Sequence, residues 1–122
     1  MCPSPETYFY FGQGLENDPF EYGGNLQLPL QKVYAFNPLH GVSEQARRHV
    51  LGGQCCNWSE YTWNEKDLEW KLWPRACAMA ETLWLGEAKP GYADFSRRMR
   101  EHRRRLVRAG VNAAPLPDGD AD

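Results

Sequence analysis

Two short segments of this chain have the character of buried β-strands, and a stretch with helical patterns separates them. Tyr8 to Phe11 is an aromatic run of high β-propensity, and Val50 to Asn57 is the second candidate, interrupted by a pair of glycines. Residues 12–29 have the turn-forming residues of a long loop. Parallel strands need a long crossover, usually a helix. The sequence therefore predicts an α/β chain with two parallel strands.

Helical patterns cover much of the remaining chain. They occupy residues 30–36, 43–49, 67 onward and 91–109. Ser43 suits the N-cap of the second helix and Gly110 the C-terminal cap of the last. Pro74 interrupts the third pattern, so a helix either begins there or kinks one turn earlier. Each strand is thus followed by a helix, which makes two βα units, whereas eight such units close a (β/α)8 barrel.

The net charge of -2 conceals a basic run near the C-terminal end. Residues 97–108 contain seven arginines and one glutamate. Apolar and aromatic residues recur through this run at helical spacing, so the arginines fall on the outer faces of an amphipathic helix. We therefore expect a solvated face and no nucleic-acid binding. Docking of an acidic protein partner through Arg100 and Arg104 stays open as an alternative.

Several classes of protein and site are not indicated. No apolar run approaches the roughly 18 residues of a membrane span, and the N-terminus lacks the basic and apolar regions of a signal peptide. The four cysteines are Cys2, Cys55, Cys56 and Cys77, and the three histidines are His40, His49 and His102. They form no metal-binding pattern and no disulfide framework. We expect no metal, no cofactor, no membrane contact and cysteines that act as small buried residues; the compartment is not indicated.

The segment from Gly52 to Tyr61 contains the pattern of a sugar site. If the second strand continues through it, Cys56, Trp58 and Glu60 point to one side. An indole can lie against the C–H face of a pyranose while an ionised carboxylate accepts hydrogen bonds from its hydroxyls. The alternative is a buried tryptophan beside a glutamate that caps a helix.

Taken in order, several motifs resemble glycoside hydrolase family 20, the β-N-acetylhexosaminidases. The first is Gly-Gly-Gln-Cys-Cys-Asn-Trp-Ser-Glu over residues 52–60, and the second is the Trp-Pro-Arg motif that begins at Trp73 and continues to Trp84. A final helix with arginines and His102 follows. The resemblance extends from about Ser4 to about Pro115 and concerns the C-terminal part of the catalytic barrel.

This resemblance implies a particular fold. Residues 1–112 would form the seventh and eighth βα units of a TIM barrel, which is incomplete in this chain. The remainder of the barrel is expected upstream or as another chain. Residues 113–122, rich in proline and aspartate, are expected to form a disordered tail.

The resemblance also implies an activity and roles for three residues. The family removes terminal N-acetylglucosamine or N-acetylgalactosamine with retention, using the substrate's own acetamido oxygen as nucleophile. Tyr10 would position the acetamido group, Trp58 would wall the pocket, and Glu60 would accept from the outer hydroxyls. The family's Asp-Glu acid pair is absent from the chain. We therefore expect a fragment of an exo-acting β-N-acetylhexosaminidase that is inactive alone.

One position departs from the family pattern. Gly12 stands where the family usually has an aspartate or asparagine that contacts the outer hydroxyls. Either a neighbour such as Gln13 substitutes, or hydroxyl recognition is weaker, which leaves gluco or galacto preference open. Two further hypotheses also remain, a non-catalytic sugar-binding module and a protein-interaction module.

Overall fold

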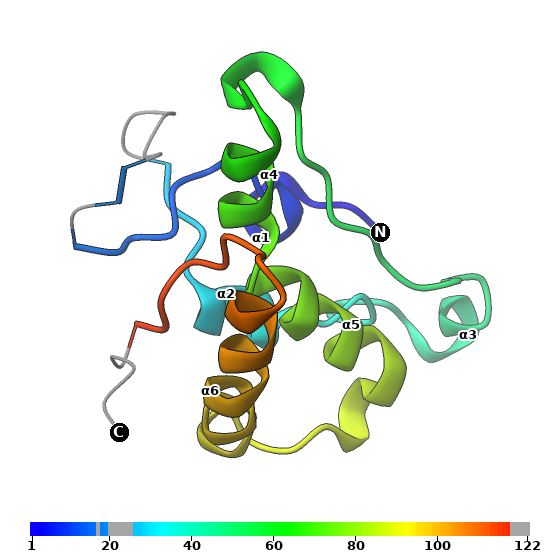
Figure 1. Ribbon diagram of the computed structural model, residues 1–122. Helices are drawn as coiled ribbons and strands as arrows, with labels where there is room; N and C mark the ends of the chain where they lie inside the picture. Colours follow the sequence, from blue (N-terminus) through cyan, green and yellow to red (C-terminus); the bar gives the residue numbers. More distant parts are fainter. Residues whose placement is uncertain (17, 20–25, 118–122) are drawn as a thin grey trace.

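The computed structural model describes residues 1–16, 18–19 and 26–117, and helices dominate them (Figure 1). The α-helices are α1 (Ser4–Thr7), α2 (Leu30–Ala35), α3 (Glu44–Arg47), α4 (Glu65–Leu72), α5 (Arg75–Leu85) and α6 (Tyr92–Arg108). Two 3₁₀ turns, η1 (Ser59–Tyr61) and η2 (Gly86–Ala88), complete the regular structure. Residues 17 and 20–25 of the predicted long loop lie outside the described residues.

The two predicted strands are reduced to one parallel bridge, and Tyr8 to Phe11 forms a turn in which the Phe11 amide donates to the Tyr8 carbonyl at 3.2 Å. Tyr8 pairs with Cys56 in the parallel sense, and no longer strand occurs within the described residues. The Phe9 amide donates to the Cys56 carbonyl at 2.7 Å, and the Cys56 amide donates to the Thr7 carbonyl at 2.8 Å. The parallel direction agrees with the prediction, but the expectation of two full strands over 8–11 and 50–57 is wrong. Strand ladders need neighbours on their edges. Within the described residues the pairings are single bridges, Tyr8 with Cys56 and Gly12 with Gln27.

The predicted helices are present with shifted ends. The helical patterns over 30–36, 43–49 and 91–109 correspond to α2, α3 and α6. The pattern containing Pro74 is two helices, because α4 ends at Leu72 and α5 starts at Arg75. A proline has no amide hydrogen to continue the helical ladder, which accounts for the break. At the start of α4 the Asn64 side chain accepts from the Asp67 amide at 3.1 Å.

The hydrophobic core lies where α2 packs on α5 and α6 (Figure 1). Its buried members are Phe9, Phe11, Leu28, Leu30, Val33, Tyr34, Phe36, Ala78, Met79, Phe95, Met99 and Leu116. Small residues on α5, such as the fully buried Ala78, let α2 approach closely.

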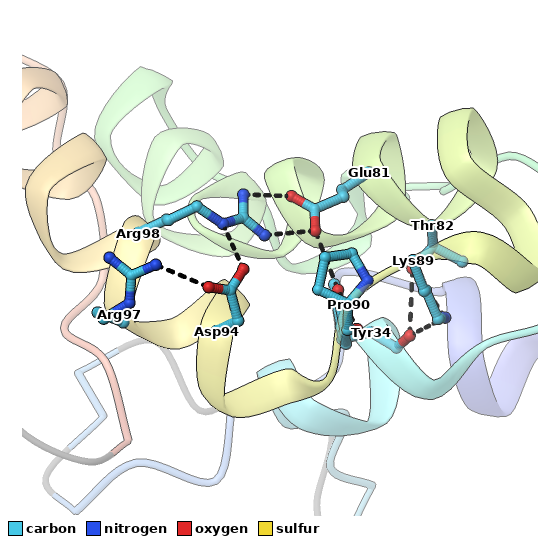
Figure 2. Close-up of polar contacts among 8 residues, drawn as sticks. All are labelled: Tyr34, Glu81, Thr82, Lys89, Pro90, Asp94, Arg97 and Arg98. Carbon is cyan, nitrogen blue, oxygen red and sulfur yellow. Dashed lines mark hydrogen bonds and ion pairs between the residues drawn. The ribbon is translucent and has the colours of Figure 1, made fainter.

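A polar network also joins α2, α5 and α6 (Figure 2). Arg98 donates to both oxygens of Glu81, at 2.8 and 2.7 Å, and to Asp94 at 2.8 Å. The Tyr34 hydroxyl lies 2.9 Å from Glu81 and 2.7 Å from the Pro90 carbonyl oxygen. Burial and the hydrogen bond to Glu81 raise the pKa of Tyr34 to about 12. Arg98 of the basic run therefore forms ion pairs with residues of this same chain.

Residues 113 to 117 pack against the rest of the chain, in contrast to the predicted disordered tail. Ala113, Ala114 and Leu116 are buried. The Ala114 amide donates to the Trp73 carbonyl at 3.1 Å, and Arg103 donates to the Ala114 carbonyl at 2.7 Å. Residues 118–122, the remainder of the predicted tail, lie outside the described residues.

Arg75, the first residue of α5, connects several segments through a fully buried side chain. Its guanidinium donates to the carbonyls of Phe11 at 2.9 Å and Leu28 at 3.1 Å, and also to that of Phe9. Further bonds reach the Lys71 carbonyl at 3.0 and 2.7 Å. Burial lowers the pKa of Arg75 to about 9, so the side chain remains charged at neutral pH. One cation thus satisfies backbone carbonyls from three parts of the chain.

Replacing Arg75 with methionine is expected to lower the free energy of unfolding by about 3–5 kcal/mol, because buried carbonyls lose their donor. Urea unfolding followed by circular dichroism measures this loss. Arg97→Met is the matched control, since Arg97 is exposed and pairs only locally with Asp94; its cost is expected to be about 1 kcal/mol or less. If Arg75→Met does not fold, Arg75→Lys, which keeps the charge without the fork, should still fall well below the control. Equal losses of unfolding free energy at Arg75 and Arg97 would contradict the stabilising role given to the buried Arg75.

Candidate functional site

The parallel bridge between Tyr8 and Cys56 brings the two predicted site segments together. The Tyr8 ring lies edge-on to the Trp58 ring, with centroids 5.8 Å apart, and 6.0 Å from the Tyr10 ring. Tyr10 and Trp58, which the sequence assigns to one site, therefore belong to one aromatic cluster with Tyr8 between them. The bridge sets Tyr8 beside the segment that leads to Trp58, and the turn over Tyr8 to Phe11 places Tyr10 next to Tyr8.

The geometry around Glu60 differs from the predicted strand. Trp58 is extended, with φ -87° and ψ 140°, but Ser59–Tyr61 forms the 3₁₀ turn η1. Strand alternation therefore ends at Trp58, and the expectation that Glu60 shares its face by alternation is wrong. The turn instead stacks the Tyr61 ring on the Tyr10 ring, with centroids 6.0 Å apart and planes at 20°. Tyr61 is thus part of the cluster, although the sequence prediction did not include it.

Glu60 still acts on the Tyr10 phenol through its charge. Burial raises the pKa of Tyr10, and the negative charge of Glu60 raises it further. A tyrosine phenol is protonated at neutral pH even with its ordinary pKa, so it can donate a hydrogen bond. A donor, an acceptor carboxylate and aromatic faces therefore lie together.

The loop that holds Trp58 and Glu60 is fastened at both ends. The Asn57 side-chain amide donates to the Thr62 hydroxyl oxygen at 2.8 Å, and the Lys71 ammonium donates to the same oxygen at 3.3 Å. The Trp63 amide donates to the Asp67 carboxylate at 3.0 Å. Because Lys71 and Asp67 belong to α4, this helix forms the base of the loop.

The surroundings of Gly12 bear on the missing aspartate or asparagine. Gln13 is buried, and its side-chain amide donates to the Trp70 carbonyl at 2.6 Å. The Asp18 carboxylate accepts from the backbone amide of Gln13 at 3.3 Å and from the Trp70 indole N–H at 2.9 Å. The Gln13 side chain is therefore engaged with α4.

The aromatic cluster forms an open face. Trp58 is 48% exposed, Tyr61 is 37% exposed, and Glu60 is exposed as well. The sequence prediction did not include Tyr8 or Tyr61. The position of Tyr61 directly after Glu60 could have indicated it. A ligand on this face would contact rings and a carboxylate from two separate segments of the chain.

A pocket of about 410 Å³ lies elsewhere, between α2, the end of α5 and the start of α6. Lys89 lies on its wall and donates to the Tyr34 carbonyl (Figure 2). It also donates to the Phe36 carbonyl at 3.1 Å and to the Thr82 hydroxyl at 3.2 Å. These polar groups are engaged in holding the helices together. The aromatic face is therefore the better candidate site.

Two sequence expectations concern metals and membranes. Among the residues described, no group of three or more His, Cys, Asp or Glu side chains is arranged to hold a metal ion. No helix in that same part of the chain has the length and apolar character to cross a bilayer.

Comparison with known proteins identifies consistent relatives. Residues 1–87 match the family model described as glycosyl hydrolase family 20, catalytic domain. The chain is 38% identical over 103 residues to a beta-hexosaminidase of Porphyromonas gingivalis, covering 83% of this chain and 13% of that protein. It is 42% identical over 86 residues to a chitooligosaccharidolytic beta-N-acetylglucosaminidase of Ostrinia furnacalis, covering 70% and 14%.

Solved structures extend the similarity to the fold. A GH20 exo beta-N-acetylglucosaminidase from Vibrio harveyi, in complex with N-acetylglucosamine, matches with a TM-score of 0.79 and 30% identity over 92% of this chain and 18% of that one. A Streptomyces plicatus N-acetyl-beta-hexosaminidase matches with a TM-score of 0.83 at 18% identity, over 97% of this chain and 23% of that one. The chain spans between 13% and 20% of the length of its curated relatives.

Replacing Glu60 with glutamine is expected to lower the pKa of Tyr10 toward its ordinary value. The sign follows because a nearby negative charge opposes formation of the phenolate, and its removal relieves that opposition. Alkaline titration of tyrosinate absorbance, with Tyr10→Phe used to assign the Tyr10 component, measures the change. Glu44→Gln on α3, where the carboxylate pairs with Arg47, is the control and should leave the Tyr10 pKa unchanged. An unchanged Tyr10 pKa in Glu60→Gln would show that the charge of Glu60 does not act on the Tyr10 phenol.

Proposed function

The chain belongs to glycosyl hydrolase family 20, and from this membership we propose that it forms the sugar-binding side of an exo-acting β-N-acetylhexosaminidase. The substrate is a glycoside with a terminal N-acetylglucosamine or N-acetylgalactosamine residue. The names of the relatives support an amino sugar, and the Vibrio harveyi structure holds N-acetylglucosamine. Since the chain spans a small part of its relatives, the activity is proposed for the protein that completes the barrel.

The observation that supports this proposal most is the aromatic cluster beside Glu60. Trp58 offers an exposed indole against which the C–H face of a pyranose can lie. Glu60 is an exposed carboxylate that can accept hydrogen bonds from sugar hydroxyls, a charge-assisted contact worth roughly 1.5–3 kcal/mol. The cluster therefore provides both the apolar and the polar contacts that a sugar requires.

Tyr10 has the role closest to the chemistry in this proposal. In substrate-assisted retention, the acetamido oxygen of the substrate attacks the anomeric carbon, and charge develops on the acetamido group. A protonated phenol at Tyr10 donates to the acetamido oxygen and holds it in line for attack. The phenol is protonated at neutral pH, and burial and the charge of Glu60 raise its pKa further.

The proton donor for the leaving group is not in this chain. The sequence contains no Asp-Glu dipeptide, the acid pair expected from the family resemblance. Binding and acetamido positioning would thus come from this chain, and proton transfer from the rest of the barrel. The chain by itself is proposed to bind without turnover.

Replacing Trp58 with alanine is expected to weaken binding of N-acetylglucosamine about tenfold, because the sugar loses its stacking face. Ligand-observed NMR titration measures the affinity without relying on tryptophan fluorescence. Trp84→Ala is the matched control, since Trp84 is 88% exposed on α5, and it should bind as the unmodified chain does. Equal affinity in both variants would place the sugar elsewhere.

Replacing Tyr10 with phenylalanine is expected to weaken N-acetylglucosamine binding roughly 2- to 10-fold while leaving glucose binding unchanged, because only the acetamido sugar uses the phenol. The same titration with both sugars measures the difference. Tyr92→Phe on α6 serves as the control. A similar loss for both sugars would show that the phenol does not recognise the acetamido group.

A further inference from the structure

Two cysteines from distant parts of the sequence meet beside the candidate site. The Sγ atoms of Cys2 and Cys56 lie 3.3 Å apart. The backbone around them is paired, because the Gln54 amide donates to the Met1 carbonyl at 3.3 Å and the Cys56 amide donates to the Thr7 carbonyl at 2.8 Å. Residues 1–2 therefore run alongside the segment that leads to Trp58.

We propose that Cys2 and Cys56 are a redox modification site and form a reversible disulfide with a small-molecule disulfide such as oxidised glutathione as the oxidant. The free thiols recorded at both positions are then the reduced state of this site. The inference does not depend on sugar binding, because it rests on the thiol geometry alone.

The geometry requires a small displacement. A disulfide joins sulfur atoms at about 2.05 Å, so the two Sγ atoms at 3.3 Å must move closer by little more than 1 Å. Cys2 lies outside the helices, in the stretch before α1, and a rotation of its side chain does not disturb a helical ladder. Both thiols are only partly buried, so a small oxidant can reach them.

The surroundings favour Cys2 as the attacking thiol. Burial acts to raise the pKa of Cys2, but hydrogen bonds with Thr7, Cys56 and Gln54 outweigh it and lower that pKa below its ordinary value. The hydrogen bond with Cys2 and then burial raise the pKa of Cys56. The two thiols thus differ in the way that suits a nucleophilic and a resolving cysteine.

The reaction balances in two exchanges. The Cys2 thiolate attacks one sulfur of glutathione disulfide, which forms a mixed disulfide and releases one glutathione thiolate. The Cys56 thiol then loses its proton to solvent and attacks the Cys2 sulfur, which releases the second glutathione. Two cysteine thiols are oxidised by two electrons, and one glutathione disulfide is reduced to two glutathione molecules.

The other cysteines are less suited to this reaction. Burial raises the pKa of Cys77 to about 11, and burial also raises the pKa of Cys55. Fewer thiolates form at these positions than at Cys2, and the Cys56 sulfur lies 3.3 Å from that of Cys2, so oxidation is selective for the pair Cys2 and Cys56. The bond would tie the segment before Tyr10 to the segment before Trp58, and so stiffen the site.

The test is incubation of the full chain in glutathione buffers of increasing disulfide content, followed by alkylation and peptide mass spectrometry. We expect a Cys2–Cys56 cross-link, two of the four thiols protected from alkylation, and an unfolding midpoint raised by roughly 10 °C over the reduced chain. Cys2→Ser and Cys56→Ser should each lose both the cross-link and the shift in midpoint.

Two control variants separate the pair from its neighbours. Cys77→Ser should form the cross-link as before, and Cys55→Ser assigns the bond to Cys56, because Cys55 and Cys56 lie on the same tryptic peptide. Four alkylated thiols at every glutathione ratio would overturn the proposal. A bond formed through Cys55, or a glutathione adduct at Cys2 that never resolves, would overturn it as well.

Discussion

The buried guanidinium of Arg75 is the interaction on which the rest of the described structure depends. Backbone carbonyls that are removed from water need a donor, and in a complete sheet a neighbouring strand supplies it. Here the carbonyls of Phe9, Phe11 and Leu28 instead accept from one planar cation. An arginine suits this position because its five donors lie in a rigid fork. The turn over Tyr8 to Phe11 and the segment of Leu28 therefore keep a defined position, although only single bridges occur among the described residues.

The same cation positions the candidate site. Phe9 and Phe11 flank Tyr10, so Arg75 holds the backbone on both sides of the phenol. From that backbone the Tyr10 ring meets Tyr61, which belongs to the turn that contains Glu60. The site thus arises from packing between separate segments. Arg75 of α5 holds the backbone of one segment, and the aromatic rings of that segment and of residues 58–61 contact one another. The open aromatic face of the site is consistent with a chain that spans part of its relatives.

Local features predicted some parts of this structure well and others poorly. Pro74 and Gly110 mark helix ends in the sequence as they do in the fold, because a missing amide hydrogen and a positive φ act within one turn. The prediction of two full strands was wrong because strand ladders need partners that are distant in sequence or absent from this chain. The packing of Ala113 and Ala114 was missed for a related reason, since the residues that their segment contacts, Trp73 and Arg103, belong to other parts of the chain.

By itself, the sequence determined the family and the order of the helices, because motifs and helix ends are written in neighbouring residues. It also named Tyr10, Trp58 and Glu60 as the candidate site residues. Tertiary structure alone decided that Ser59 begins a turn, that Tyr61 stacks on Tyr10 and that Cys2 meets Cys56. These relations join residues far apart in the chain or on separate segments. They depend on the register of one parallel bridge and on the reach of one buried arginine, which no local pattern encodes.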